Sequence, residues 1–101
     1  MRLILQFDID ADIIDVPQFV IENRDVLQKR FTKWLYNKQI KHSYWVTFRD
    51  KNGKVFCGVK YRSDAFVEWL NKKVLADENK KARIVAEHVS ECPEGIPKLN
   101  F

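Results

Sequence analysis

The sequence has little of the residues that mark fibrous, disordered or disulfide-rich chains. Its 101 residues include only 3 glycines, 3 prolines and 2 cysteines. This excludes a collagen-like or low-complexity chain and a disulfide scaffold. No uncharged apolar run approaches the roughly 20 residues of a membrane span, and residues 1–8 are too short and too acidic for a signal peptide. We therefore expect one cytoplasmic domain with reduced cysteines and no membrane contact.

Charge is abundant but unevenly distributed. The chain has 18 basic and 14 acidic residues, a net charge of +4. Residues 1–25 carry 2 basic and 6 acidic side chains, whereas residues 26–101 carry 16 basic and 8 acidic ones. A basic body with an acidic N-terminal segment favours polyanionic or acidic partners. Paired lysines are also typical of solvated helices and loops, so charge alone does not name the partner.

The first third of the chain has the pattern of a strand followed by a helix. Leu3, Leu5, Phe7 and Ile9 occupy alternate positions, separated mostly by polar side chains, which predicts a strand with one buried face. The segment from Asp12 to Asp15 is expected to break away from this strand. Helical spacing of apolar residues then predicts a helix over 17–37, with Asn23 as an alternative starting point for a shorter helix.

The clearest local signal is a β-hairpin. Residues 43–49 and 55–61 have strand-like composition, and Asn52-Gly53 between them is a strong tight-turn signal. A two-residue loop centred there places Arg49 opposite Phe56. It also directs Trp45 and Phe56 to the same face, and Phe48 and Cys57 to the opposite face, toward the core.

The remaining pattern completes a βαββαβ order. Ser63 is expected to cap a helix that ends near residue 75, and residues 82–89 are expected to form a last strand. The predicted fold is ferredoxin-like: an antiparallel four-stranded sheet of order 4-1-3-2 with two helices on one face. The predicted domain covers residues 1–90, and residues 91–101 are expected to form an irregular tail.

In this fold one sheet face stays open, and we expect it to carry the binding site. Trp45 and Phe56 would stack on bases, surrounded by basic side chains. The same rings also suit a protein partner, and a tail folded across the sheet would bury them instead. The candidate site residues are Trp45, Phe56, Lys60, Arg49, Lys54 and Arg83.

The octamer Lys54-Val55-Phe56-Cys57-Gly58-Val59-Lys60-Tyr61 resembles the RNP1 motif of RNA-recognition motifs. Lys54, Phe56, Val59 and Tyr61 match that motif. Gly58 stands where the family has a second stacking aromatic residue, and Val55 replaces the family's glycine. The resemblance implies a βαββαβ topology with RNA on the sheet, and it does not extend to family membership.

Two groups of residues suggest metal chemistry. Asp8 at a strand end resembles the opening of small ferredoxin-like nucleases of the VapD and CRISPR-associated kinds, which implies a divalent ion at Asp8. The alternative is that the N-terminal aspartates, Asp8, Asp10, Asp12 and Asp15, end the strand and cap the following helix. His42, Cys57, His88 and Cys92 lack the paired spacing of zinc sites, and Cys57 is expected in the core. We expect neither a cofactor nor a metal.

Three functions follow in order of preference. The first is a non-enzymatic module that binds single-stranded nucleic acid on the open sheet face. The second is a protein-interaction domain using the same aromatic patch, such as an inhibitor or adaptor encoded by a phage or mobile element, or a homodimer. The third is a metal-dependent nuclease. No glycine-rich phosphate loop or catalytic triad spacing favours an enzyme.

Overall fold

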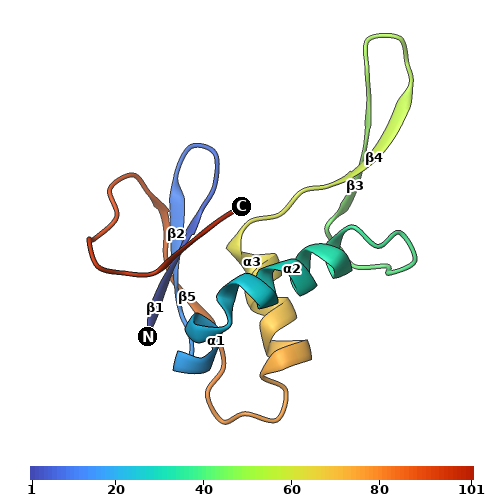
Figure 1. Ribbon diagram of the computed structural model, residues 1–101. Coiled ribbons are helices and arrows are strands. Elements are labelled where there is room, and N and C mark those ends of the chain that lie inside the picture. Colours follow the sequence, from blue (N-terminus) through green and yellow to red (C-terminus); the bar gives the residue numbers. More distant parts are fainter.

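The computed structural model describes residues 1–101 and contains one four-stranded sheet. Its strand order is β5-β2-β1-β6 (Figure 1). Strand β1 pairs antiparallel with β2 and parallel with β6, while β2 pairs antiparallel with β5, so the sheet is mixed. These strands are β1 (Arg2–Gln6), β2 (Ala11–Asp15), β5 (Arg83–Val89) and β6 (Lys98–Asn100).

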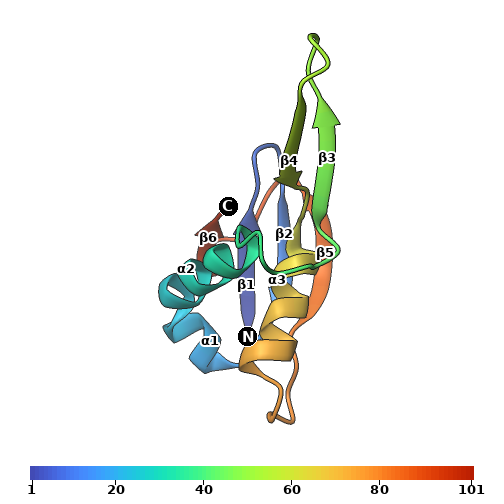
Figure 2. The same ribbon diagram turned by 90° about the vertical axis from the view of Figure 1, so that its right-hand side faces the viewer.

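All helices lie on one face of this sheet (Figures 1 and 2). Phe31, Phe66 and Leu3 are fully buried between the two layers, where they form part of one apolar core. None of the helices combines the length and apolar character that crossing a membrane requires. The helical elements are α1 (Gln18–Glu22), α2 (Arg24–Leu35), α3 (Ser63–Trp69) and the π-helical turn η1 (Leu70–Val74).

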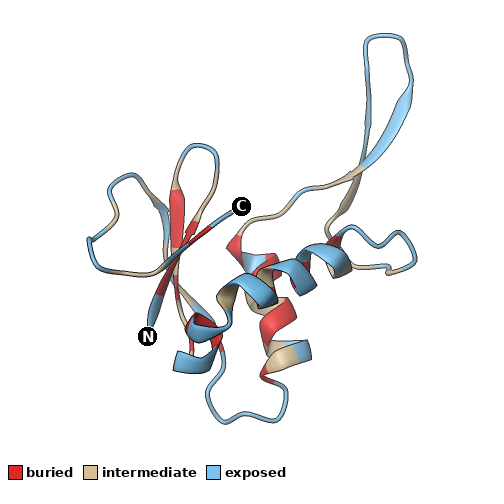
Figure 3. Cartoon of the chain, in the orientation of Figure 1, coloured by how far each residue is buried: buried red, intermediate tan, exposed pale blue.

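Strands β3 (Trp45–Arg49) and β4 (Val55–Val59) form a separate two-stranded sheet, here called the arm. The arm projects away from the body (Figure 2), and most of its residues are exposed (Figure 3). The radius of gyration is 14.9 Å, compared with about 13 Å for a compact domain of this length. The projecting arm accounts for this excess.

The predicted ferredoxin-like fold is wrong. The chain is α+β, but its six strands form two sheets, and the arm strands do not join the main sheet. The segment from Asp12 to Asp15 does not end the first strand. It belongs to β2, which pairs with β1 along its whole length. Aspartate is depleted in strands, so the sequence pattern concealed this second strand. The helix expected over 17–37 is divided at Asn23.

The C-terminal segment expected to be irregular contributes a strand. β6 places Leu5 beside Leu99, which is only 3% exposed. Phe101 stacks on Phe7 with ring centroids 5.5 Å apart. The burial of these two apolar side chains explains why this end of the chain returns to the sheet.

The hairpin is present, but its predicted register is wrong by one residue. Gly53 has a φ of +78°, and the backbone of Asp50 pairs with that of Lys54. The loop therefore has three residues, Lys51 to Gly53, rather than two. This odd shift exchanges the faces of one strand relative to the other. Phe48 thus lies opposite Phe56, and Trp45 lies opposite Val59.

Candidate nucleic-acid interface

Basic side chains concentrate on the arm and the segments that connect it to the body. Residues 36–62 contain 7 basic side chains and 1 acidic side chain, a net charge of +6. The rest of the chain contains 11 basic and 13 acidic residues, a net charge of −2. The positive charge of this protein is therefore concentrated in residues 36–62, which include the arm. Its basic residues are Lys38, Lys41, Arg49, Lys51, Lys54, Lys60 and Arg62.

The arm exposes a pair of stacked phenyl rings. The ring centroids of Phe48 and Phe56 are 5.7 Å apart with an interplanar angle of 21°. Phe48 is 53% exposed and Phe56 is 38% exposed, and Lys54 Nζ lies 5.5 Å from the Phe56 ring. Gly58 makes room for this pair, because a Cβ there would lie 3.0 Å from Phe48 Cε1.

The arm joins the body through two segments: residues 40–44, here called its first root, and residues 60–62, its second root. Aromatic residues anchor the first root. Trp45 Nε1 donates a hydrogen bond of 2.8 Å to the Ile40 carbonyl, and the Trp45 ring stacks on His42 at 5.1 Å and 4°. The Tyr44 hydroxyl donates to Glu68 on α3. The indole N–H of Trp45 and one face of its ring are therefore engaged by other residues of the protein.

The other predicted site residues are divided between two regions. Arg49, Lys54 and Lys60 lie on the arm or at its second root, and all three are exposed. Arg83 lies on the main sheet, where its Nε is 3.6 Å from Asp15 Oδ2. The fold does not bring Arg83 to the arm, and it places Trp45 and Phe56 on opposite faces of the hairpin. Cys57, which we expected in the core, is exposed on the arm.

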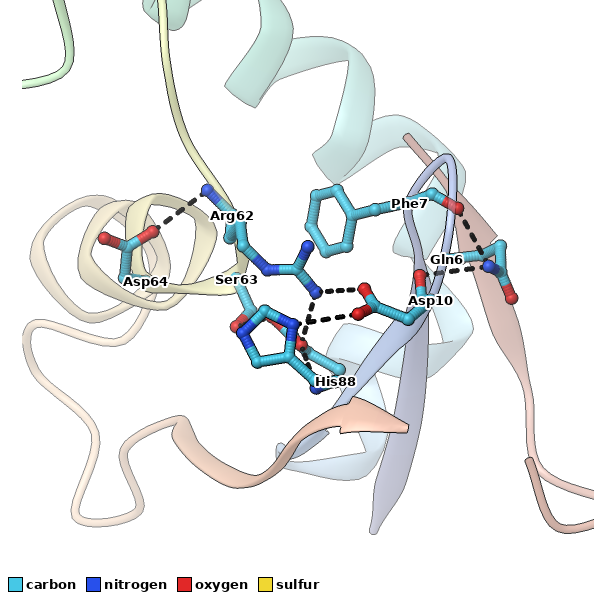
Figure 4. A network of polar contacts seen from close by, with 8 residues as sticks. Gln6, Phe7, Asp10, Arg62, Ser63, Asp64 and His88 are labelled. Atoms are coloured by element: carbon cyan, nitrogen blue, oxygen red, sulfur yellow. Dashed lines mark hydrogen bonds and ion pairs between the residues drawn. The ribbon is translucent and has the colours of Figure 1, made fainter. Parts of the chain in front are cut away.

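The second root of the arm is held by a polar network (Figure 4). Arg62 Nη2 donates to Asp10 Oδ1 at 2.7 Å and to Asp12 Oδ1 at 2.8 Å. The Arg62 guanidinium also lies 4.7 Å from the centre of the Phe7 ring. Ser63, expected to cap α3, instead donates its hydroxyl to Asp12 Oδ2 at 2.5 Å. The network thus joins β2 to the point where the arm becomes α3.

His88 completes this network through an irregularity in β5. Asp12 lies opposite two residues, Glu87 and His88, because β5 bulges there. His88 has a φ of +55°, which is uncommon for a residue with a side chain. Its backbone N–H donates to Asp12 Oδ1 at 3.1 Å, and its Nδ1 lies 2.8 Å from Asp10 Oδ2. A bulge of this kind redirects side chains toward a common point.

The charges of the two aspartates are stabilised by this arrangement. Hydrogen bonds from His88 and Arg62 lower the pKa of Asp10. Burial raises the pKa of Asp12, but hydrogen bonds from Arg62, Ser63 and the His88 backbone outweigh it and lower that pKa. Asp10 and Asp12 are therefore ionised at neutral pH, and their hydrogen bonds to Arg62 connect the arm to the body.

The metal interpretation of the N-terminal aspartates finds no support in the geometry. Nowhere do three histidine, cysteine or acidic side chains converge in a way that suits a metal ion. Asp8 lies in the exposed turn after β1, whereas Asp10 and Asp12 bind Arg62.

Sequence reasoning missed Phe48 and Arg62. Phe48 was expected to face the core, because the two-residue loop sets the wrong face. An asparagine-glycine pair also occurs in three-residue loops that end in a left-handed glycine, and Asp50 before it accepts hydrogen bonds from the Asn52 and Lys54 amides. No local signal identified Arg62, whose partners are 50 and 52 positions away.

Comparison of this chain with protein-family models, with curated proteins and with solved structures finds no significant match. The sheet platform implied by the RNP1-like octamer is absent, because β4 lies in the arm and has only β3 as a neighbour.

Proposed function

We propose that this protein binds single-stranded nucleic acid through the arm. The observation that carries the proposal is the coincidence of charge and exposed rings: residues 36–62 have a net charge of +6, and the Phe48–Phe56 pair lies among them. The binding surface differs from the open sheet face expected from the sequence, because the arm stands apart from the main sheet.

The charge supports contacts to phosphates. Arg49, Lys51 and Lys54 surround the tip of the arm, where the only acidic side chain, Asp50, accepts backbone hydrogen bonds from the loop. None of the three basic side chains forms an ion pair within the protein. Phosphate neutralisation by such side chains releases counterions, which makes affinity strongly dependent on salt.

The rings support contacts to unpaired bases. Both Phe48 and Phe56 keep part of their surface exposed, and a base stacked on an aromatic side chain contributes about 1–3 kcal/mol. Duplex bases are already stacked on each other, so a ring that binds by stacking favours single strands. The basic side chains would then follow the phosphates on either side of the stacked base.

The proposal is tested by fluorescence anisotropy with a labelled oligothymidylate of about 12 nucleotides. The triple variant Arg49→Ala, Lys51→Ala, Lys54→Ala is expected to reduce the slope of log affinity against log salt by about 2, since each lost phosphate contact removes about 0.7. Phe56→Ala is expected to lower the affinity by about 1–3 kcal/mol with little change in the slope.

A matched control replaces basic residues outside the arm. Lys29, Lys33 and Lys80 are exposed on α2 and on the loop before β5, so changing all three to alanine removes the same charge. This control is expected to keep most of the affinity. Absence of binding by the wild-type chain at about 50 mM salt, or equal losses in both triple variants, would contradict the proposal.

A second candidate function is the binding of a protein partner with an apolar surface by the arm. It is favoured by Val55, which is 52% exposed beside Phe56, and by the unpaired outer edges of β3 and β4, which are templates for strand addition. An apolar interface of this kind persists at high salt, whereas counterion release weakens nucleic-acid binding. Light scattering of the purified chain would reveal self-association through the same edges.

A further inference from the structure

A second basic and aromatic feature lies at the first root of the arm. A cavity of about 360 Å³ opens there, between the end of α2 and the α3–η1 helix. Cavities of this size class hold small organic ligands. The residues that matter for its chemistry are Trp34, His42, Lys41, Lys72 and Lys73.

The charge of this cavity is positive. Lys72 Nζ forms an ion pair of 2.7 Å with Glu68 Oε1, and Glu68 also accepts the hydroxyl of Tyr44. Both oxygens of Glu68, the one carboxylate of the cavity, therefore already have a partner within the protein. Lys41 and Lys73 are exposed and form no ion pair in the protein, so two ammonium groups remain for an anionic ligand.

The cavity also offers an aromatic surface that continues toward the arm. Trp34 and His42 have ring centroids 4.6 Å apart, and His42 stacks in turn on Trp45, the first residue of β3. His42 Nε2 donates a hydrogen bond to the Leu35 carbonyl, and His42 Nδ1 accepts one from the Tyr44 backbone N–H. These two hydrogen bonds hold the imidazole in place. Trp34 is half-buried, also packs on Phe31 with ring centroids 6.1 Å apart, and contributes the exposed part of its side chain to the cavity lining.

We propose that this cavity binds one nucleotide of a single strand, with the base against Trp34 and a phosphate between Lys41 and Lys73. This inference rests on the proposed function and deepens it, because the His42–Trp45 stack connects the cavity to the arm. A strand held by the arm would continue past its first root into the cavity. The cavity would then make binding depend on side chains outside the arm.

The first experiment removes the two free ammonium groups. Lys41→Ala with Lys73→Ala is expected to reduce the salt slope for the oligothymidylate by about 0.7, because the two lysines hold one phosphate. The matched control, Lys29→Ala with Lys33→Ala, removes two exposed lysines from α2 outside the cavity and is expected to leave the slope unchanged. In one outcome, the wild type and the arm variants behave as expected while the Lys41/Lys73 variant keeps the wild-type slope. That result overturns the proposal that the cavity binds a nucleotide, and the arm proposal stands.

The second experiment tests the cavity without the arm. Thymidine monophosphate is expected to quench tryptophan fluorescence of the wild-type chain, and Trp34→Phe is expected to lose most of that quenching, because Trp45 does not line the cavity and Trp69, which does, is only 3% exposed. Circular dichroism confirms that each variant is folded. Quenching that survives in both the Trp34→Phe and the Lys41/Lys73 variants overturns the inference. Absence of any quenching by the mononucleotide in the wild type overturns it as well.

Discussion

The guanidinium of Arg62 lies 2.8 Å from the carboxylate of Asp12, although the two residues are 50 positions apart. Asp12 is only 1% exposed and accepts three hydrogen bonds, from Arg62, Ser63 and the His88 backbone. Arg62 is separated from Val59, the last residue of the arm, only by Lys60 and Tyr61. This ion pair therefore couples the buried sheet to the orientation of the proposed binding element.

Arg62→Ala is expected to destabilise the protein, because it leaves the buried carboxylate of Asp12 without its charged donor. The loss is expected to be about 2–3 kcal/mol in the free energy of unfolding, measured by urea denaturation. Arg83→Ala serves as the control, since its pair with Asp15 is exposed and 3.6 Å long and is worth less than about 1 kcal/mol. Equal losses in the two variants would show that the network does not hold the fold.

Stability is expected to fall in acid. The pKa values of Asp10 and Asp12 are lower in the folded chain than their usual value of 3.8. Their contribution is therefore fully present above about pH 4 and is lost as the pH falls through the folded pKa values. Urea midpoints at several pH values below neutrality measure this loss. Asp10→Asn with Asp12→Asn should be less stable at neutral pH but should show a shallower acid dependence; an unchanged acid dependence would assign it to other groups.

Gly53→Ala is expected to loosen the arm without unfolding the body. Gly53 has a φ of +78°, and a Cβ added there would meet no atom within 4 Å, so only backbone strain of about 1–2 kcal/mol opposes the alanine. Amide hydrogen exchange is expected to accelerate in β3 and β4 alone. Gly95→Ala is the matched control, with a φ of +80° and equally open surroundings. Arm amides that exchange alike in both variants would contradict the three-residue loop.

Local sequence patterns predicted the elements with local causes. The hairpin around Asn52-Gly53 and the helix beginning at Ser63 are present, because turn residues and helical spacing act over a few positions. The candidate residues Arg49, Lys54, Phe56 and Lys60 remain on or beside the arm for the same reason. The function proposed for them stays a prediction.

Other parts of the site depended on partners that no local pattern reveals. A single additional loop residue reversed the face of Phe48, since side chains in strands alternate with a period of two. Trp45, expected to bind bases, is engaged by His42 and Ile40. Arg83, expected beside these rings, lies on a sheet that does not include the arm.

The amino-acid sequence by itself determined the basic character of residues 36–62 and the hairpin within them, because charge and turn chemistry belong to the residues that carry them. Only the tertiary structure decided that β2 is a strand. Its buried Asp12 is tolerated inside the protein because Arg62 and Ser63, from a distant segment, donate hydrogen bonds to its carboxylate. The same holds for the arm, which is separate from the sheet because β1 pairs with β2 and β6 on its two sides. With both edges of β1 occupied, the hairpin had no central place in the sheet.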